Sequence, residues 1–429
     1  MKQKKEGKMT LIDDAKQNTI SRTIQESAEY DGVSTDYICQ GLIDGTIVIP
    51  KNKNRNFKAR AIGNGLTTKI NINLGTSENN VDLKEELKKL DIAVQFGADS
   101  FMDLSTSGNL DQIRRELLAS GSIMMGTVPI YSVISQLAEK DLDFTKMSAD
   151  MLFDEIEKQA EQGVDFMTVH CGLNYRSLDF LERNPRLVGI VSRGGSMLKH
   201  WMKVNKQENP LYEQFDRLLK ICRKHDVTLS LGDGLRPGGQ ADATDHAQLA
   251  ELMVLGELVK KCRLNNVQVM VEGPGHVPWK DIEMNIHLQK ALCQKAPFYV
   301  LGPLTTDISP GYDHITGAIG ATAAAVYGAD FLCCVTPAEH LCLPNCDDIK
   351  QGTIAFKIAA HSADISKGIK KSIQRDYNMS QARANLCWES MYEYAIDPDH
   401  AKERKHQTSS GKNECSMCGK LCAIKVANQ

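Results

Sequence analysis

The chain has 429 residues, of which 42% are hydrophobic and 24% charged, and its formal net charge is −3. This length suits roughly two or three domains, or one large barrel with additions. The small negative charge gives no reason to expect nucleic acid or an anionic membrane surface as a partner, and no apolar run reaches the roughly 18 residues of a membrane span. The polar N-terminus carries no secretory signal, and thirteen cysteines without a disulfide framework favour a cytoplasmic protein.

The first 66 residues are polar and irregular, and we expect them to form a small N-terminal domain. The pattern there predicts a helix over residues 19–30 and a solvated basic loop over residues 51–58. From residue 67 to residue 345, short β-branched segments alternate with longer amphipathic ones. The predicted strands are Lys69–Leu74, Ser100–Leu104, Ser122–Val128, Asp165–His170, Leu187–Ser192, Thr228–Gly232, Val267–Glu272, Phe298–Gly302 and Asp330–Val335. The predicted helices between them include Asp150–Glu161, Pro210–His225 and Ala247–Leu264.

Most of these strands are apolar on both faces and are followed by a helix, which is typical of a parallel α/β sheet. About eight such units in some 270 residues match the length of a (β/α)8 barrel. The second possibility is a doubly wound open sheet.

Polar residues at the ends of the predicted strands favour the barrel. They are Asn73, Asp103, Tyr131, His170, Ser192 to Gly195, Asp233 to Arg236, Glu272, Tyr299, Glu339 and His340. Barrel enzymes collect catalytic groups where the loops after all eight strands converge on one cavity. Any one of these residues could instead cap a helix or belong to the core.

Two of the strand-end segments combine glycine with arginine. Ser192-Arg193-Gly194-Gly195 could cradle a phosphate with its backbone amides and its guanidinium, although Gly-Gly after a strand is often only a tight turn. Gly232-Asp233-Gly234-Leu235-Arg236 adds a carboxylate and a second arginine. Together they suit an anionic substrate with a polar ring.

Two histidines on successive strand-end loops form a possible metal site. His276 follows Glu272 in Glu-Gly-Pro-Gly-His, and His340 ends Thr336-Pro-Ala-Glu-His. Imidazoles in this arrangement can share zinc or another divalent ion that keeps open positions. The alternative is that each histidine is only a hydrogen-bonded loop residue.

After residue 345 the pattern becomes helical, and residues 346–401 predict a small helical domain. Helices are expected over residues 347–372 and 380–395, joined by a polar loop that contains residues 375–378. Residues 402–429 predict a tail with a flexible polar tether over 402–413. Flexibility would let the tail reach a barrel cavity, in its own or a neighbouring subunit, and then seal it from solvent.

The tail contains Cys415, Cys418 and Cys422. A structural zinc ion takes four protein ligands, whereas a [4Fe-4S] cluster on three cysteines keeps one iron open. The open iron can bind S-adenosylmethionine, whose one-electron reduction gives a carbon radical. A zinc knuckle completed by a remote Cys or His is the alternative.

The sequence resembles the phosphomethylpyrimidine synthase family of thiamine biosynthesis, from about residue 40 to the end. The motifs that carry the resemblance are Thr127-Val-Pro-Ile-Tyr131, Gly189-Ile-Val-Ser-Arg-Gly-Gly195, Ser230-Leu-Gly-Asp-Gly-Leu-Arg-Pro-Gly238, Val269-Met-Val-Glu-Gly-Pro-Gly-His-Val-Pro278, Leu301-Gly-Pro-Leu-Thr-Thr-Asp307, Pro310-Gly-Tyr-Asp-His314 and Thr336-Pro-Ala-Glu-His340. The resemblance implies a homodimeric radical S-adenosylmethionine lyase with an N-terminal domain, a (β/α)8 barrel and a C-terminal helical domain. Such enzymes rearrange 5-aminoimidazole ribonucleotide to 4-amino-5-hydroxymethyl-2-methylpyrimidine phosphate, and release formate and carbon monoxide. An electron donor of the flavodoxin or ferredoxin type is expected.

The resemblance also implies the site residues. The implied substrate contacts are Asn73, Met102, Tyr131, His170, Ser192, Arg193, Gly194, Asp233, Gly234, Leu235, Arg236, Glu272 and Tyr299. Glu272 and His170 are the expected catalytic groups for proton transfer. His276 and His340 would hold zinc or another divalent metal, and Cys415, Cys418 and Cys422 the [4Fe-4S] cluster.

Three segments depart from the family pattern. The tail reads C-x2-C-x3-C where the family has C-x2-C-x4-C, and Asn71-Ile-Asn-Leu-Gly75 and Ser105-Thr-Ser-Gly108 differ near the implied substrate pocket. Three sulfurs can still reach one cubane, so we expect the cluster to survive the change in the tail. The two changes near the pocket leave a paralogous product open, the 5-hydroxybenzimidazole made from the same substrate by cobamide-pathway synthases. A zinc-dependent barrel hydrolase or lyase, using His276 and His340, is the alternative from another class.

Overall fold

The computed structural model describes residues 9–407 and 417–427. It divides into two compact units, residues 1–363 and residues 364–429, and each is described by itself. Within the described ranges no helix is both long and apolar enough to cross a membrane.

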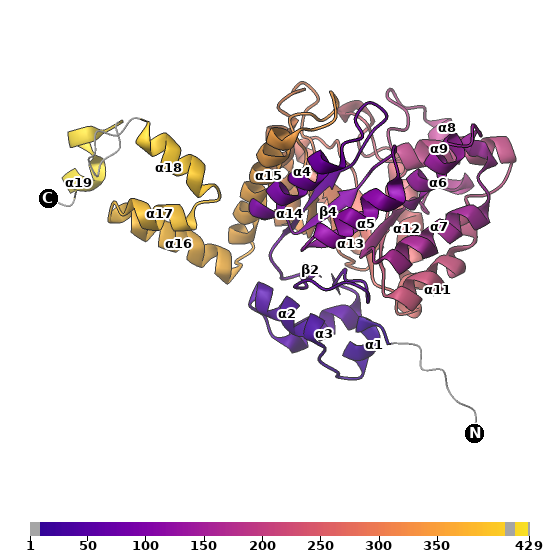
Figure 1. Cartoon of the computed structure of the whole chain (residues 1–429), viewed down its shortest axis with the longest axis horizontal. Coiled ribbons are helices and arrows are strands. Elements are labelled where there is room, and N and C mark those ends of the chain that lie inside the picture. The colour runs from indigo at the N-terminus through magenta and orange to yellow at the C-terminus, as the bar shows by residue number, and fades with distance from the viewer. Residues whose placement is uncertain (1–8, 408–416, 428–429) are drawn as a thin grey trace. The chain divides into compact units, whose positions relative to one another are not determined.

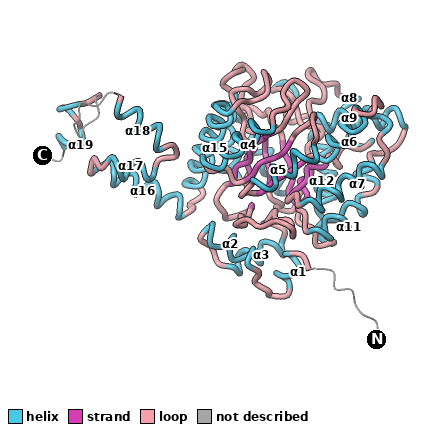
Figure 2. The backbone as a smooth tube through the Cα atoms, viewed as in Figure 1, coloured by secondary structure: helices cyan, strands magenta, loops and turns pink. Residues whose placement is uncertain are grey.

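Eight parallel strands close into a barrel in the first unit, in the order β10-β3-β4-β5-β6-β7-β8-β9. Their bounds are β3 Lys69–Leu74, β4 Ser100–Asp103, β5 Met124–Thr127, β6 Phe166–Val169, β7 Thr228–Leu231, β8 Val269–Gly273, β9 Phe298–Leu301 and β10 Phe331–Cys333. In Figure 2 these strands lie inside a layer of helices. The closed order confirms the (β/α)8 barrel and excludes the doubly wound open sheet.

The outer layer of the barrel consists of helices that follow the strands. Their bounds are α4 Leu83–Gln95, α5 Leu110–Ser120, α6 Pro129–Ala138, α7 Ala149–Gln162, α8 Tyr175–Arg183, α9 Arg193–Asn205, α10 Pro210–Glu213, α11 Phe215–His225, α12 His246–Leu264, α13 Trp279–Leu292 and α14 Asp313–Tyr327. Figure 1 shows α4, α5, α7 and α12 around the strands. The predicted helix over Pro210–His225 is two helices, because Gln214 interrupts it.

The burial of side chains explains why the strands and helices could be predicted from the sequence. All four residues of β6 are buried, as an inner strand covered by helices requires. In α11, Leu218, Leu219 and Cys222 are buried while Arg223 and Lys224 face solvent. The start of α7 is also determined by nearby residues, because the Ser148 hydroxyl caps the helix by accepting a hydrogen bond from the Met151 amide.

The N-terminal segment has a hydrophobic core of its own. It consists of α1 Leu11–Lys16, α2 Arg22–Asp31, α3 Thr35–Asp44 and the antiparallel pair β1 Ile47–Val48 and β2 Ile62–Gly63. Buried side chains there include Ile24, Ile38 and Leu42. The segment packs against the amino ends of the strands, where Lys69 at the start of β3 forms a buried ion pair with Asp31 at 2.9 Å.

The basic stretch over residues 51–58 is not a freely solvated loop, so that prediction is wrong. Asn52 is buried and donates to the carbonyls of Ala160 and Val164. Arg55 lies 3.6 Å from the buried carboxylate of Asp165, just before β6. The loop therefore anchors the N-terminal segment under the barrel.

The prediction of a strand over Leu187–Ser192 is also wrong, because this segment is an exposed loop between α8 and α9. Leu187 is 83% exposed, and Gly189 has φ +77°, which an extended strand does not accommodate. The amides of Leu187 and Val188 donate to the carboxylate of Asp242, both at 2.8 Å, and not to a neighbouring strand. β-branched residues form a strand only where their side chains are also buried against neighbouring elements.

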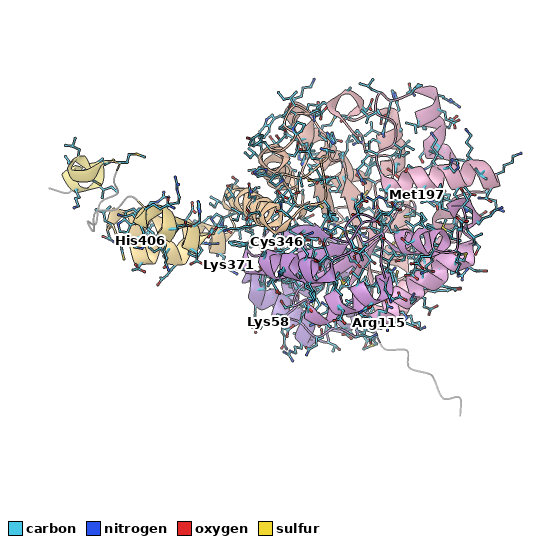
Figure 3. All side chains as sticks on the ribbon, turned by 45° about the horizontal axis from the view of Figure 1, so that its top comes forward. Lys58, Arg115, Met197, Cys346, Lys371 and His406 are labelled. Carbon is cyan, nitrogen blue, oxygen red and sulfur yellow. The ribbon has the colours of Figure 1, made fainter. Side chains whose placement is uncertain are left out.

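The C-terminal part is helical. Its elements are α15 Cys346–Ser366, α16 Lys370–Ala384, α17 Trp388–Tyr394, α18 Pro398–His406, the 3-10 turn η3 Gly419–Leu421 and α19 Ala423–Ala427. Figure 3 labels Cys346 at the first residue of α15 and His406 at the last residue of α18. The predicted helix over 347–372 ends early, since Gly368 adopts φ +78°, and the polar residues 375–378 lie inside α16 and not in a loop. Helix α18 also extends into the predicted tether.

Candidate functional site

A cavity opens at the carboxyl ends of the barrel strands and encloses about 520 Å³ of empty space including its mouth. Its lining residues are Asn73, Met102, Leu104, Val128, Tyr131, Thr168, His170, Asp233, Arg236, Glu272, Gly273, Tyr299, Val300, Leu301 and Cys333. Eight of the thirteen residues predicted to contact substrate are among them. The fold thus brings together side chains that lie up to 226 residues apart, from Asn73 to Tyr299.

Glu272 is fixed within this cavity by two hydroxyl groups from neighbouring strands. Its Oε1 accepts from Thr168 Oγ1 at 2.6 Å and from Ser230 Oγ at 2.9 Å. Burial raises the pKa of Glu272, although these hydrogen bonds and the charge of Arg236 oppose that rise. A carboxyl group with a raised pKa is suited to taking up and returning a proton.

Asp233 and Arg236 form an ion pair on the loop after β7, with Arg236 Nη1 3.1 Å from Asp233 Oδ1. The second oxygen, Oδ2, is buried and has no hydrogen-bond partner among the described residues. Burial raises the pKa of Asp233 to about 7, with the charge of Glu272 adding to the effect. An unpartnered buried oxygen is costly unless a ligand or a water molecule supplies a donor, so Asp233 Oδ2 is a candidate ligand-binding atom.

His170 is buried at the end of β6, and its Nδ1 has no partner within the described part of the chain. Burial lowers the pKa of His170 to about 3, and the charge of Arg236 acts in the same direction. The ring is therefore neutral at physiological pH and presents a free nitrogen. Gly194 packs against the ring, where a Cβ would lie 2.4 Å from Nδ1.

Ser192 and Arg193 form the amino end of α9. The Ser192 hydroxyl caps the helix by accepting from the Gly195 amide at 3.1 Å, and the Arg193 guanidinium lies 5.1 Å from the centroid of the Tyr131 ring. The amino end of a helix beside a guanidinium attracts anions. Arg193 lines a second cavity, which shares Asn73 and Leu104 with the first.

Five predicted substrate contacts do not line the first cavity: Ser192, Arg193, Gly194, Gly234 and Leu235. Gly194 supports the His170 ring. Gly234 lies against Gly195: a Cβ on Gly195 would come 2.3 Å from the Gly234 carbonyl oxygen. Leu235 is fully buried, and its amide donates to Glu251 Oε2 at 2.7 Å. Gly234 and Leu235 therefore shape the loop that carries Asp233 and Arg236.

Sequence reasoning missed Thr168 and Cys333 as cavity residues. The Cys333 sulfur accepts from Asn73 Nδ2 at 3.2 Å, and burial raises the pKa of its thiol to about 11. Both residues occupy inward positions in their strands. The period of two along a strand could have found them, because Thr168 precedes His170 by two residues and Cys333 follows Phe331 by two.

The predicted metal ligands His276 and His340 lie together, with ring centroids 5.3 Å apart. His276 Nδ1 is 2.8 Å from Asp307 Oδ1, and His340 Nδ1 is 3.6 Å from Asp313 Oδ2. The Asp313 oxygen is buried and accepts no hydrogen bond from the described residues. Two imidazoles beside carboxylates are a suitable donor set for zinc or iron, so the residues present fit a divalent metal.

Cys418 and Cys422 flank η3 in the second unit, and the predicted third ligand, Cys415, lies outside the described residues. Cys418 is exposed, whereas Cys422 is 8% exposed. Both line a mainly apolar cavity that also includes Trp388 and Tyr392. Two thiols separated by one short turn fit part of a cluster site.

Comparison with known proteins decides the family. The sequence profile described as the Radical SAM ThiC family matches residues 10–429. The chain belongs to the Radical SAM ThiC family. It is 55% identical over 423 residues to a phosphomethylpyrimidine synthase of Carboxydothermus hydrogenoformans, which covers 98% of this chain and 99% of the relative. It is 52% identical to the phosphomethylpyrimidine synthase of Thermoanaerobacter sp. (strain X514), with 98% of each chain covered.

A dihydropteroate synthase structure from Xanthomonas albilineans covers 75% of this chain and 98% of its own, with 10% identity and a TM-score of 0.41. That likeness is too weak to bear on fold or function. As a member of the Radical SAM ThiC family, this protein is expected to use an iron–sulfur cluster and S-adenosylmethionine, which agrees with the three cysteines close together in its tail.

Proposed function

We propose that this protein is a phosphomethylpyrimidine synthase, a radical S-adenosylmethionine lyase that converts 5-aminoimidazole ribonucleotide to 4-amino-5-hydroxymethyl-2-methylpyrimidine phosphate. The family match over residues 10–429 and the shared name of its relatives support this activity. The observation that carries the proposal is the barrel cavity, where Glu272, Asp233, Arg236 and His170 converge.

The first cavity and the second cavity that shares Asn73 and Leu104 with it together offer a place for each part of the ribonucleotide. We assign the phosphate to Arg193 and the amino end of α9, where a guanidinium and free helix amides are available. Asp233 and Arg236 would orient the aminoimidazole and the ribose hydroxyls. The unpartnered Asp233 Oδ2 supports this role, because a hydroxyl or amino group of the substrate would satisfy it.

Glu272 and His170 are the proposed proton-transfer groups. Bond cleavage within the sugar requires a nearby acid or base, and both side chains face the same cavity. Glu272 is the proposed acid or base, since burial raises the pKa of its carboxyl group and two hydroxyl groups hold it in place. The His170 ring is neutral and can donate or accept a hydrogen bond; because burial lowers its pKa, it would take up a proton only where the negative charge of a bound substrate favours the charged form.

We assign the [4Fe-4S] cluster to Cys415, Cys418 and Cys422, with S-adenosylmethionine as the second cofactor. When bound, they supply a carbon radical that removes hydrogen from the ribose. An electron donor of the flavodoxin or ferredoxin type would deliver the electron. A reducing cytoplasm fits the free buried thiols of Cys171 and Cys222.

We assign the second metal, zinc or another divalent ion, to His276 and His340. The 5.3 Å separation of their rings and the nearby Asp313 oxygen support this assignment. Near the cavity, such an ion would place a fixed positive charge beside anionic groups.

For the quaternary and domain organisation we propose a homodimer with four regions in each chain: residues 1–66, 67–345, 346–401 and 402–429. The separate core of the first region and the barrel strands from Lys69 to Cys333 support the first two boundaries. The helices from α15 onward support the third.

The test is anaerobic incubation of reconstituted protein with 5-aminoimidazole ribonucleotide, S-adenosylmethionine and dithionite, followed by mass spectrometry. The proposal predicts the pyrimidine phosphate with formate and carbon monoxide. Formation of 5-hydroxybenzimidazole instead would assign the chain to the paralogous activity. Iron and sulfide analysis separates both from a zinc-dependent hydrolase, since a cubane requires about four of each per cluster.

A further inference from the structure

Asp307 joins two loops that carry different parts of the proposed site. Its Oδ1 lies 2.8 Å from His276 Nδ1, on the loop after β8. Its Oδ2 accepts from the backbone amide of Gln240 at 2.7 Å, on the loop after β7 that also carries Asp233 and Arg236. Both oxygens of one carboxylate are therefore engaged.

The surrounding backbone holds Asp307 in register with His276. The amide of Leu304 donates to the Gly275 carbonyl at 2.7 Å, and the amide of Val277 donates to the Leu304 carbonyl at 3.1 Å. The Gln240 side chain donates to the same Leu304 carbonyl at 2.7 Å. The distance from Asp307 to His276 is thus set by main-chain contacts on both sides.

The chemistry of these contacts determines where the His276 proton lies. A carboxylate only accepts hydrogen bonds, so the nitrogen that faces Asp307 must be the donor. The proton then sits on Nδ1, and the lone pair of the neutral ring is on Nε2. Metal-binding histidines are commonly oriented in this way by a carboxylate.

We propose that Asp307 is a positioning residue that fixes His276 as the Nδ1–H tautomer, so that Nε2 is the metal-binding atom, and that it links this ligand to the loop of Asp233 and Arg236. The inference rests on the metal assigned to His276 and His340 under the proposed function. Asp307 itself does not touch the metal. Its side chain is 42% exposed, whereas that of His276 is 10% exposed.

Asp307→Asn tests the proposal because an amide cannot accept from both partners. The Gln240 amide can only donate, so the asparagine oxygen must face it, and the asparagine NH2 group then faces His276. The ring would have to accept at Nδ1 and carry its proton on Nε2, which removes the metal-binding lone pair. Asp281→Asn is the matched control, since it removes a carboxylate on α13, five residues beyond His276, and none of the described histidines is hydrogen-bonded to Asp281.

The first readout is the zinc affinity of the metal-stripped, cluster-reconstituted full chain, measured without substrate or S-adenosylmethionine. The zinc bound by His276→Gln measures binding at sites other than His276 and is subtracted from the binding of the other proteins. We expect Asp307→Asn to weaken the His276-dependent site by about 10- to 100-fold, and Asp281→Asn to stay within about twofold of wild type. Unchanged zinc affinity in Asp307→Asn would overturn the proposal. Equal zinc binding by wild type and His276→Gln would show that His276 is not a zinc ligand, and the proposal for Asp307 would fall with that assignment. This outcome would not bear on synthase turnover.

The second readout is the tautomer itself, from 15N-histidine spectra of the metal-free chain, with His276 assigned by its loss in His276→Gln. The proposal predicts a proton on Nδ1 in wild type and on Nε2 in Asp307→Asn. An Nε2-protonated His276 ring in wild type would overturn the proposal even if Asp307→Asn does not fold. A purely structural role for Asp307 would leave the tautomer unchanged.

Discussion

The backbone of Gly194 lies directly against the ring of His170: a Cβ on Gly194 would come 2.4 Å from both Cε1 and Nδ1 of the imidazole. The first turn of α9 therefore sets the position of a side chain at the end of β6. Sequence resemblance implied that Gly194 contacts substrate, and the structure adds this separate reason for a residue without a side chain.

Gly194→Ala should displace the His170 ring, because no real Cβ contact is as short as 2.4 Å. We expect a loss of stability of about 1–3 kcal/mol from overpacking and a fall in product formation of at least about tenfold. Thermal unfolding and turnover measure the two effects. Ser196→Ala, an exposed position in the same helix, should change neither; wild-type turnover in Gly194→Ala would show that the His170 position does not matter.

Glu272→Gln should preserve the cavity while removing the proton-transfer group. The amide oxygen can still accept from Thr168 and Ser230, so the side chain should stay in place. Product formation at saturating substrate should fall about 10²- to 10⁴-fold with the iron content unchanged. Glu257→Gln, on the surface of α12, is the control. Turnover of Glu272→Gln within threefold of wild type would exclude Glu272 as acid or base.

Glu251→Gln should alter the pH dependence of stability. Burial raises the pKa of Glu251 to about 8 in the folded chain, above its ordinary value of 4.5. Between these values the unfolded chain releases a proton that the folded chain keeps, so wild-type stability contributed by this group falls as pH rises. The free energy of unfolding of Glu251→Gln, relative to that of wild type, should therefore increase by roughly 2–3 kcal/mol from pH 5.5 to pH 7.5. Denaturant unfolding at both pH values measures the gain, and an equal difference at the two pH values would contradict the pKa assignment.

Cys418→Ala should abolish cluster binding without unfolding the barrel, because Cys418 lies in the unit of residues 364–429 and the barrel strands lie in the other. Iron should fall from about four per chain to below about one, and 5′-deoxyadenosine formation should stop. Cys387→Ala, an exposed cysteine of the same unit, should retain both. A Cys418→Ala protein that keeps its iron would exclude this residue as a ligand.

The barrel could be predicted from sequence because its eight strands are buried on both faces and separated by amphipathic helices. The error at Leu187–Ser192 has a physical cause: Leu187, Val188 and Val191 are exposed, and the amides of Leu187 and Val188 bond to Asp242 and not to a neighbouring strand. The helix boundary at Gly368 was missed because glycine occurs inside helices too, and only its positive φ identifies it as an end.

The site was predictable where chemistry sits at a strand end, as for His170, Asp233 and Glu272. It was not predictable where a residue acts through tertiary contacts. Nothing in the local sequence indicates that Glu251 accepts from the Leu235 amide, or that Asp307 bonds to His276 and Gln240 together. Those roles exist only once the loops after β7, β8 and β9 meet at one end of the barrel.

The proposed function depends most directly on hydrogen removal from the ribose of a substrate held in the barrel cavity. The deciding measurement uses 5-aminoimidazole ribonucleotide deuterated throughout the ribose, with reconstituted protein, S-adenosylmethionine and dithionite, and mass analysis of the 5′-deoxyadenosine. The predicted result is deuterium in the 5′-deoxyadenosine formed by the wild-type protein. Cys418→Ala should form no 5′-deoxyadenosine, and Glu272→Gln should form little pyrimidine product. Pyrimidine product accompanied by 5′-deoxyadenosine without deuterium would contradict the proposed function.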